Sequence, residues 1–204
     1  MKSRVLVGLF ILFAFAGTAA AQVQPSIKGG VNFATLNGEF DEDEGDETRM
    51  QKRVGGVFGA GVSIPTGSDR VTFDLDVLYS QEGVKLKGGV FGDTDATLRL
   101  DYVRIPMLFR IGVGSGSGGY FLVGPSIGLL VNAEYKSDEG GTEDAKNFYK
   151  NADFGIAVGA GANIRKFFVQ GTYMFGVTDI NEDSGDKIFN NRNSVITALV
   201  GVRF

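Results

Sequence analysis

The sequence lacks cysteine, histidine and tryptophan, and it contains only four prolines among 204 residues. Without cysteine there is no disulfide, no thiolate nucleophile and no lipid attached to an N-terminal cysteine. Without histidine the chain has neither the commonest general base nor the commonest metal ligand. Glycine, by contrast, occurs 31 times, and in a helix it costs about 1 kcal/mol per position relative to alanine. The composition therefore argues against long helices and against histidine-dependent chemistry.

The first 21 residues have the composition of a secretory signal peptide. Lys2 and Arg4 precede the apolar run VLVGLFILFAFAG, and the small residues of TAAAQ follow, which predicts cleavage after Ala21. A membrane anchor is the alternative, but no stop signal with positive flanks follows the run. Residues 22–204 then form one exported domain with 18 basic and 24 acidic residues, a formal net charge of −6. This balance, with no basic stripe, argues against nucleic acid as a partner.

Eight later segments alternate apolar and polar side chains, which is the pattern of a strand with one apolar face. The clearest is RVTFDLDVLYS, in which every second residue from Val71 to Tyr79 is apolar. In the last, SVITALVGVRF, the alternation runs to Phe204. Eight strands of about ten residues are what a small membrane barrel needs. The segments are residues 26–36, 53–64, 70–80, 102–111, 120–135, 153–164, 167–177 and 194–204.

The connections between these segments alternate in length. After the second, fourth and sixth segments they are short, reading PTGSD, GVGSGSG and RK, whereas the others are longer and polar. This asymmetry is typical of outer-membrane barrels, which have short periplasmic turns and longer extracellular loops. The sequence therefore predicts an all-β fold, an eight-stranded antiparallel up-and-down transmembrane β-barrel whose last strand closes against its first. The long loops are expected at residues 36–50, 83–97, 136–150 and 178–193.

Aromatic residues on the apolar faces lie toward the strand ends. The middles of the strands carry mainly aliphatic residues, alanine and glycine. Two aromatic girdles around an aliphatic band indicate a bilayer rather than a soluble core, although a lipocalin-like barrel or a sandwich would show the same alternation. The predicted loop-side girdle is Phe33, Tyr79, Tyr135, Phe154 and Phe175, and the turn-side girdle is Phe73, Phe109, Phe121, Phe167 and Phe204.

The opposite faces of the strands carry charged residues, which we place in the lumen. An eight-stranded barrel is just wide enough for side chains to fill, so we expect a packed network of ion pairs and hydrogen bonds. A hairpin that turns near Val90 would set Asp76 across from Arg104. The alternative is a narrow polar channel or ion relay, which bulky residues such as Tyr102 and Met174 would interrupt. The predicted network is Lys28, Asp74, Asp76, Arg104, Arg110, Asp153 and Arg203, and Arg53 and Gln170 share its face.

No motif in the sequence marks a catalytic, cofactor or metal site. The acidic run DEDEGDE at residues 41–47 lacks the ligand spacing of an EF-hand, and such a loop is usually solvated. Contact with a basic partner, or divalent bridging to lipopolysaccharide phosphates, is the functional alternative for this loop. Because the commonest catalytic base is absent, we expect that the protein is not an enzyme and holds no cofactor.

Taken together, the segments resemble a known family. IKGGVNFATL, VLYSQEGVKLKG, LDYVRIPMLFR, GPSIGLLVNAEY, DFGIAVGAGANI and YMFGVTDI are similar to stretches of the outer-membrane β-barrel family that includes the PorT-like proteins of Bacteroidota. The resemblance covers essentially the whole mature chain and implies fold and cell outer membrane, with no catalytic signature to carry over. The aromatic Phe204 on an amphipathic strand also resembles the signal that the barrel-assembly machinery recognises.

These observations lead to an expectation about function. We expect a non-enzymatic integral outer-membrane protein, surrounded by lipid and lipopolysaccharide, that is structural or docks a protein partner through its extracellular loops. An accessory role in secretion or envelope assembly is one form of this expectation. The alternatives are a narrow small-solute channel and a soluble periplasmic lipocalin-like carrier of an apolar ligand.

Overall fold

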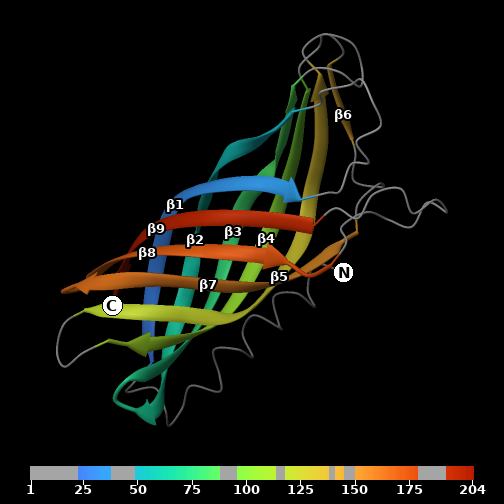
Figure 1. Cartoon of the computed structure of the whole chain (residues 1–204). Helices are drawn as coiled ribbons and strands as arrows, with labels where there is room; N and C mark the ends of the chain where they lie inside the picture. Colours follow the sequence, from blue (N-terminus) through green and yellow to red (C-terminus); the bar gives the residue numbers. More distant parts are fainter. Residues whose placement is uncertain are drawn as a thin grey trace, which may run out of the picture.

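The computed structural model describes residues 23–37, 49–87, 96–113, 118–137, 141–144, 150–178 and 192–204. In these ranges the chain forms β-strands, coloured along the sequence in Figure 1. No helix in the described ranges is long and apolar enough to span a membrane. The strands are β1 (Gln24–Asn37), β2 (Arg49–Ser68), β3 (Val71–Lys87), β4 (Ala96–Gly112), β5 (Gly119–Ser137), β6 (Gly141–Asp144), β7 (Ala152–Ile164), β8 (Phe167–Gly176) and β9 (Arg192–Arg203).

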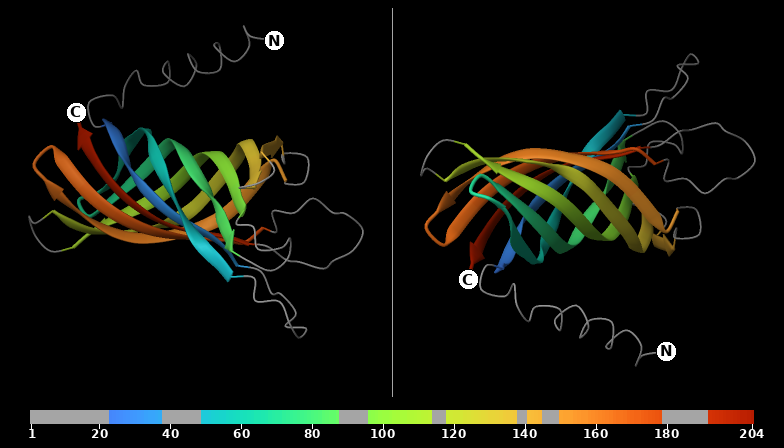
Figure 2. Two further views of the ribbon diagram at one scale, coloured as in Figure 1. Left: turned by 90° about the horizontal axis from the view of Figure 1, so that it is seen from above. Right: turned by 90° about the horizontal axis from the view of Figure 1, so that it is seen from below.

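Eight of these strands close into a cylinder. Consecutive strands pair antiparallel, except that the short β6 pairs only with β5, and β5 continues the cylinder by pairing with β7. The ring closes where β1 pairs with β9, with Val31 opposite Ala198 and Phe33 opposite Ile196, and Figure 2 shows it from two opposite directions. This confirms the predicted eight-stranded antiparallel barrel. Closure leaves none of the eight with a free edge, whose unpaired backbone groups would cost several kcal/mol each in lipid.

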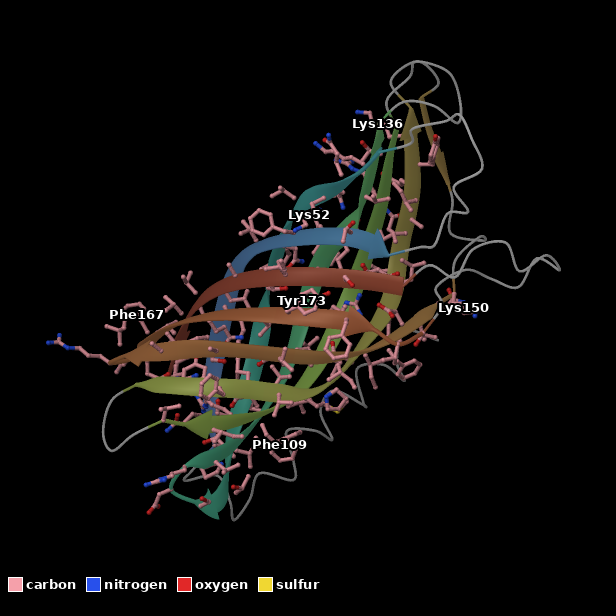
Figure 3. The ribbon with its side chains drawn as sticks, viewed as in Figure 1. Lys52, Phe109, Lys136, Lys150, Phe167 and Tyr173 are labelled. Atoms are coloured by element: carbon pink, nitrogen blue, oxygen red, sulfur yellow. The ribbon has the colours of Figure 1, made fainter. Side chains whose placement is uncertain are left out.

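The outside of the cylinder is apolar. Side chains along β7 and β8 alternate between buried and exposed positions, and Figure 3 shows Phe109, Phe167 and Tyr173 projecting from the wall. Phe58, Phe167 and Val200 are 61%, 65% and 62% exposed. A protein in water rarely exposes a continuous apolar surface of this extent. The surroundings that fit this face are the hydrocarbon chains of a bilayer.

Strands β2 to β5 are longer than the expected ten residues. They contain 20, 17, 17 and 19 residues, and a tilted strand needs only about 9–11 to cross a bilayer. Most of the excess lies at the loop end, where β2, β3, β4 and β5 extend together beyond the other strands of the cylinder in Figure 1. Parts of the predicted loops are therefore strands. We call residues 49–52, 83–87, 96–100 and 132–137 of these strands, together with β6, the loop-side extension.

A β-bulge in β5 changes which side chains face the lumen. Tyr102 pairs with Leu130, and β5 has one extra residue, Val131, before the next pair. A bulge of this kind reverses the alternation beyond it, so Leu130 and Ala133 are both buried. Tyr135 consequently packs against the buried cluster inside the barrel. Its predicted place in the loop-side aromatic girdle was wrong.

Candidate functional site

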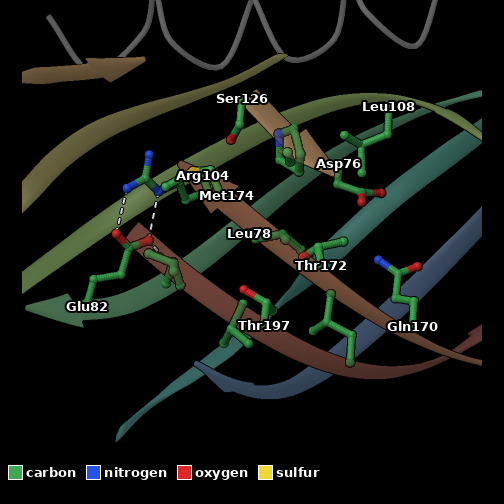
Figure 4. Close-up of a pocket in the computed structure, with 16 residues that line it drawn as sticks. Asp76, Leu78, Glu82, Arg104, Leu108, Ser126, Gln170, Thr172, Met174 and Thr197 are labelled. Carbon is green, nitrogen blue, oxygen red and sulfur yellow. Dashed lines mark hydrogen bonds and ion pairs between the residues drawn. The ribbon is translucent and has the colours of Figure 1, made fainter. Parts of the chain in front are cut away.

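Arg104 on β4 holds two carboxylates together inside the lumen. Its Nη2 lies 2.5 Å from Glu82 Oε2 on β3 and 2.7 Å from Asp153 Oδ2 on β7. Its Nε donates a second hydrogen bond to Glu82 Oε1 at 2.7 Å, and Figure 4 shows this forked contact. The guanidinium carbon also lies 4.5 Å from the centre of the Tyr102 ring. All three charged side chains are at most 5% exposed, so each depends on the others for its charge balance.

Hydrogen bonds extend this group across the barrel. Ser80 donates to Glu82 at 2.7 Å, and Asn32 donates to Ser80 at 2.7 Å. Thr197 donates to Asn32 at 2.8 Å, and Asn193 donates to the Glu82 carboxylate. We call these residues, with Arg104 and Asp153, the Arg104 network. It joins β1, β3, β4, β7 and β9, and a connected buried network of this kind rigidifies the walls that it links.

Two further ion pairs lie closer to the turn end of the lumen. Lys28 Nζ lies 2.7 Å from Asp76 Oδ1, and Arg110 Nη2 lies 3.3 Å from Asp74 Oδ1. All four residues are buried. The structure therefore divides six of the seven predicted network residues among three separate groups instead of one. The seventh, Arg203, has a different partner.

Aromatic rings inside the barrel make cation–π contacts with the buried cations. The Arg203 guanidinium carbon lies 4.3 Å from the centre of the Phe168 ring, and Lys28 Nζ lies 5.2 Å from the same centre. Arg110 lies 5.5 Å from the centre of the Tyr120 ring. Such cation–π contacts contribute about 0.5–2 kcal/mol each. Phe168 and Tyr120 were missed by the sequence analysis, although strand alternation places both on the inner face.

The expected pairing of Asp76 with Arg104 was wrong. Arg104 lies opposite Leu78. The β3–β4 hairpin is therefore centred one residue later along the chain than expected, and the residue opposite Arg104 moves by two positions, from Asp76 to Leu78. The acidic partner that Arg104 has on β3 is Glu82, which was missed because the strand was expected to end two residues before it. Continuing the alternation of Asp74 and Asp76 along β3 would have placed Glu82 in the lumen.

Glycines opposite large lumen side chains make the room that these side chains occupy. A Cβ atom on Gly128 would lie 2.5 Å from Arg104 Nη1, and one on Gly161 would lie 2.5 Å from the Tyr120 hydroxyl. Real Cβ atoms do not approach other groups so closely, so the ion pairs and rings need glycine on the facing strand. Such alternation of small and large residues fills a small barrel and accounts for part of the high glycine content.

The cavity in the middle of the described lumen is small. A cavity of about 50 Å³ lies beside Arg104, Glu82 and Thr197, as drawn in Figure 4. That volume has room for only a few water molecules. On the loop side of Arg104 the lumen is filled by a buried apolar cluster. The cluster is Val84, Leu98, Leu100, Tyr102, Leu130 and Ala133.

The aromatic residues of the outer face form pairs across strands. The rings of Phe58 and Tyr79 lie 5.3 Å apart between centres, and those of Phe73 and Phe109 lie 5.4 Å apart. Phe58 and Tyr173 are exposed aromatic residues that the predicted girdles left out. The predicted girdle residues with more than a third of their surface exposed are Phe33, Phe109, Phe121, Phe154, Phe167, Phe175 and Phe204.

Two predicted segments lie outside the described residues. They are the signal peptide, residues 1–21, and the acidic run at residues 41–47, and both stay predictions. Within the described ranges, no group of three or more acidic side chains is placed to hold a metal ion.

Residues 15–182 match the family model of the outer membrane protein beta-barrel domain. The chain belongs to this family. The match is to the family as a whole, so the narrower PorT-like assignment stays a prediction. Among curated proteins none matches the chain.

Three solved structures are similar to this chain, all at low sequence identity. Neisserial surface protein A (NspA) is 15% identical, with 88% of this chain and 97% of that chain covered and a TM-score of 0.49. Ail, the attachment invasion locus protein of Yersinia pestis, is 13% identical, with coverage of 90% and 99% and a TM-score of 0.49. OprG from Pseudomonas aeruginosa is 11% identical, with coverage of 90% and 96% and a TM-score of 0.41.

Proposed function

We propose that the protein is a non-enzymatic scaffold of the outer membrane, with a closed lumen and a binding surface at its loop end. The observation that carries the proposal is the Arg104 network, in which one guanidinium binds Glu82 and Asp153 and ties together the walls of the barrel. Removing one partner of a buried pair costs about 3–5 kcal/mol, so these contacts hold the linked strands together. A solute channel would need a continuous water path in place of these contacts.

The outer membrane is the proposed location. Membership of the outer membrane protein beta-barrel domain family supports it, and so does the apolar outer face of the cylinder. The signal-like composition of residues 1–21 agrees with export. Separation of inner and outer membranes, followed by gels of boiled and unboiled samples, tests this location. A heat-modifiable band in the outer-membrane fraction is expected, whereas a soluble protein without a mobility shift would support the lipocalin-like alternative.

The loop-side extension offers a described part of the binding surface. Lys85 and Lys136 lie in one cross-strand row, with β4 between them, and both side chains are exposed; Figure 3 shows Lys136 projecting near the end of the extension. Arg99 lies in the next row opposite Glu134, with 3.9 Å between their charged atoms. Because both of these side chains are more than a third exposed, the pair is weak. This face therefore presents a net positive charge.

The height of this basic face suggests its partner. Arg99 lies four residues beyond Val103, or about 13 Å along a tilted strand, and Val103 alternates with the buried residues of β4 on the lipid-facing side. The basic side chains thus stand just above the apolar face, where the outer leaflet carries the phosphate groups of lipopolysaccharide. We infer that these phosphates are the partner of the basic face, because each cation near an anionic surface contributes about 1 kcal/mol.

A binding assay with lipopolysaccharide tests this surface. The folded barrel in nonionic detergent is titrated with lipopolysaccharide, and a Lys85→Gln, Lys136→Gln double variant is compared with a control double variant, Arg165→Gln with Lys166→Gln. The control removes two exposed cations at the turn end. We expect the first variant to bind about fivefold more weakly per lost charge and the control to bind like the wild type. Equal losses in the two variants would refute the assignment of this face.

Planar bilayers test the closed lumen separately. Purified barrel should show no steady conductance, because the Arg104 network and the apolar cluster block the middle and the loop side of the described lumen. Single-channel steps that change in an Arg104→Ala variant would contradict the scaffold and establish the small-solute channel.

A further inference from the structure

The turn end of the lumen contains a polar cavity that the proposed scaffold does not use. Its volume is about 290 Å³, several times that of the cavity beside Arg104. Residues from six strands and one turn line it, so it is built by the closed barrel rather than by one loop. Its polar residues include Gln24, Arg70, Thr72, Arg110, Asn163 and Arg203.

Two arginines bring more hydrogen-bond donors to this cavity than the nearby protein acceptors use. Each guanidinium carries five N–H groups. Arg203 Nη1 donates to Asn163 Oδ1, but the buried Nε of Arg203 has no hydrogen-bond partner among the described residues. Arg110 is only 8% exposed, and its Nη2 lies 3.3 Å from Asp74 Oδ1, an oxygen without a hydrogen bond. Both cations therefore have capacity for an additional acceptor.

The charges around the cavity favour an anion. Arg70, Arg110 and Arg203 line it together with a single acidic side chain, Asp69. Beyond the lining, the Asp74 carboxylate adjoins Arg110, and the exposed cations of residues 165–166 lie in the β7–β8 turn at the same end. The lining residues, Asp74 and the β7–β8 turn thus contribute five cations and two carboxylates. A concave site with such an excess concentrates counter-ions of the opposite sign.

We propose that the turn-side cavity binds one small anionic group, a phosphate or a carboxylate, between Arg110 and Arg203. The planar fork of a guanidinium matches the paired oxygens of both groups, and the two forks come from β4 and β9. The anion enters from the turn end, because Phe168 and the Lys28–Asp76 ion pair fill the lumen beyond the cavity. This site is independent of the lipopolysaccharide surface, which lies at the other end of the strands.

Amide NMR of the folded barrel in nonionic detergent tests the proposal. Inorganic phosphate and acetate are titrated separately, and saturable shifts are expected at the backbone amides of Gly112, Gly119 and Asn163, which border the cavity. Arg203→Gln is expected to weaken phosphate binding about tenfold or more, because it removes a charge-assisted hydrogen-bond donor. The phosphate affinity of Arg203→Lys should lie between those of the wild type and Arg203→Gln, because lysine keeps the positive charge but lacks the paired N–H donors of a guanidinium. Arg165→Gln, whose side chain does not line the cavity, should bind like the wild type.

The mobility of unboiled samples on gels shows whether each variant is folded. If the Arg203 variants fail to fold, Arg70→Gln takes their place, because Arg70 lines the cavity from an exposed turn. Shifts that do not saturate, or equal phosphate affinity in wild type and in the folded variants, would overturn the proposal.

Nanodiscs distinguish the two sources of the anionic group. If the phosphate of a lipid headgroup occupies the cavity, anionic phospholipid should weaken the binding of added phosphate relative to zwitterionic phospholipid. This competition should disappear in the Arg203→Gln variant. If a free anion of the periplasm is the occupant, phosphate should bind equally well in both kinds of nanodisc. Either result supports the site and identifies where its ligand comes from.

Discussion

Replacing Arg104 by alanine is expected to destabilise the barrel strongly. The substitution leaves the carboxylates of Glu82 and Asp153 without their shared cation, although these side chains are only 1% and 0% exposed. Removing one partner of a buried ion pair costs about 3–5 kcal/mol. The lost contact with the Tyr102 ring, 4.5 Å from the guanidinium, adds about 0.5–2 kcal/mol. We therefore expect the free energy of unfolding to fall by about 4 kcal/mol or more.

A second arginine on the same strand provides the matched control. Arg99 faces outward, its side chain is 49% exposed, and its partner Glu134 lies 3.9 Å away. An exposed pair of this kind contributes about 0–1 kcal/mol, so Arg99→Ala should be nearly neutral. Both variants can be unfolded with urea in lipid vesicles. Because the chain has no tryptophan, far-UV circular dichroism and the mobility of unboiled samples on gels report the folded fraction.

A triple variant that lacks all three buried charges tests whether these charges control the stability of the barrel. Combining Arg104→Met with Glu82→Gln and Asp153→Asn removes the cation and both carboxylates, and replacing all members of a buried ion group is often nearly neutral. Most of the stability lost in Arg104→Ala should therefore return. If Arg104→Ala costs no more than Arg99→Ala, or if the triple variant is as unstable as the single one, the buried charges do not control the stability of the lumen.

The two faces of the barrel wall should respond differently to single substitutions. Gly201→Ala would place a Cβ atom against the Phe168 ring and should cost about 1–3 kcal/mol by overpacking. Gly171→Ala should be nearly neutral, because the nearest heavy atom would lie 4.0 Å away; equal costs in the urea titration would contradict the assigned faces. Val200, 62% exposed on the outer wall, should tolerate arginine poorly, at about 2–4 kcal/mol if it lies near the bilayer midplane. A negligible cost in vesicles would argue against a lipid-facing position.

The assignment of charged residues to the lumen could be made from alternation alone. Lys28, Asp76 and Arg110 each stand between apolar neighbours on a strand, and the structure buries all three. Successive side chains of a strand point to opposite faces, so one apolar face is enough to place the other. The same argument would have found Glu82 and Phe168 if the strands had been given their full length.

The partners of these charges could not be read from the sequence. A shift of one residue in the centre of the β3–β4 hairpin set Arg104 opposite Leu78 instead of Asp76. Its carboxylate partner on β3 is Glu82, four residues further along the strand. The partner on β7, Asp153, lies 49 residues from Arg104 along the chain. Register depends on how a whole hairpin and its neighbours pack, and no local pattern encodes it.

The strand ends were the least predictable part of the fold. The outer face of the loop-side extension of β2 to β5 is polar, as at Lys85 and Lys136. The apolar alternation that predicts the strands therefore stops before the strands end. The apolar alternation of β5 did not indicate the bulge at Val131. This bulge places Tyr135 against the buried apolar cluster instead of on the outer face.

The sequence by itself determined that this chain forms an eight-stranded antiparallel barrel with short turns, an apolar outer face and a charged inner face. These properties follow from side-chain periodicity and connection length, which are local. Only the tertiary structure decided which carboxylate meets Arg104, how far the strands extend at the loop end, and that Arg110 and Arg203 border one cavity at the turn end. The physical reason is that closure of the ring sets register and stagger for all eight strands together, and these bring residues from distant strands to the same height.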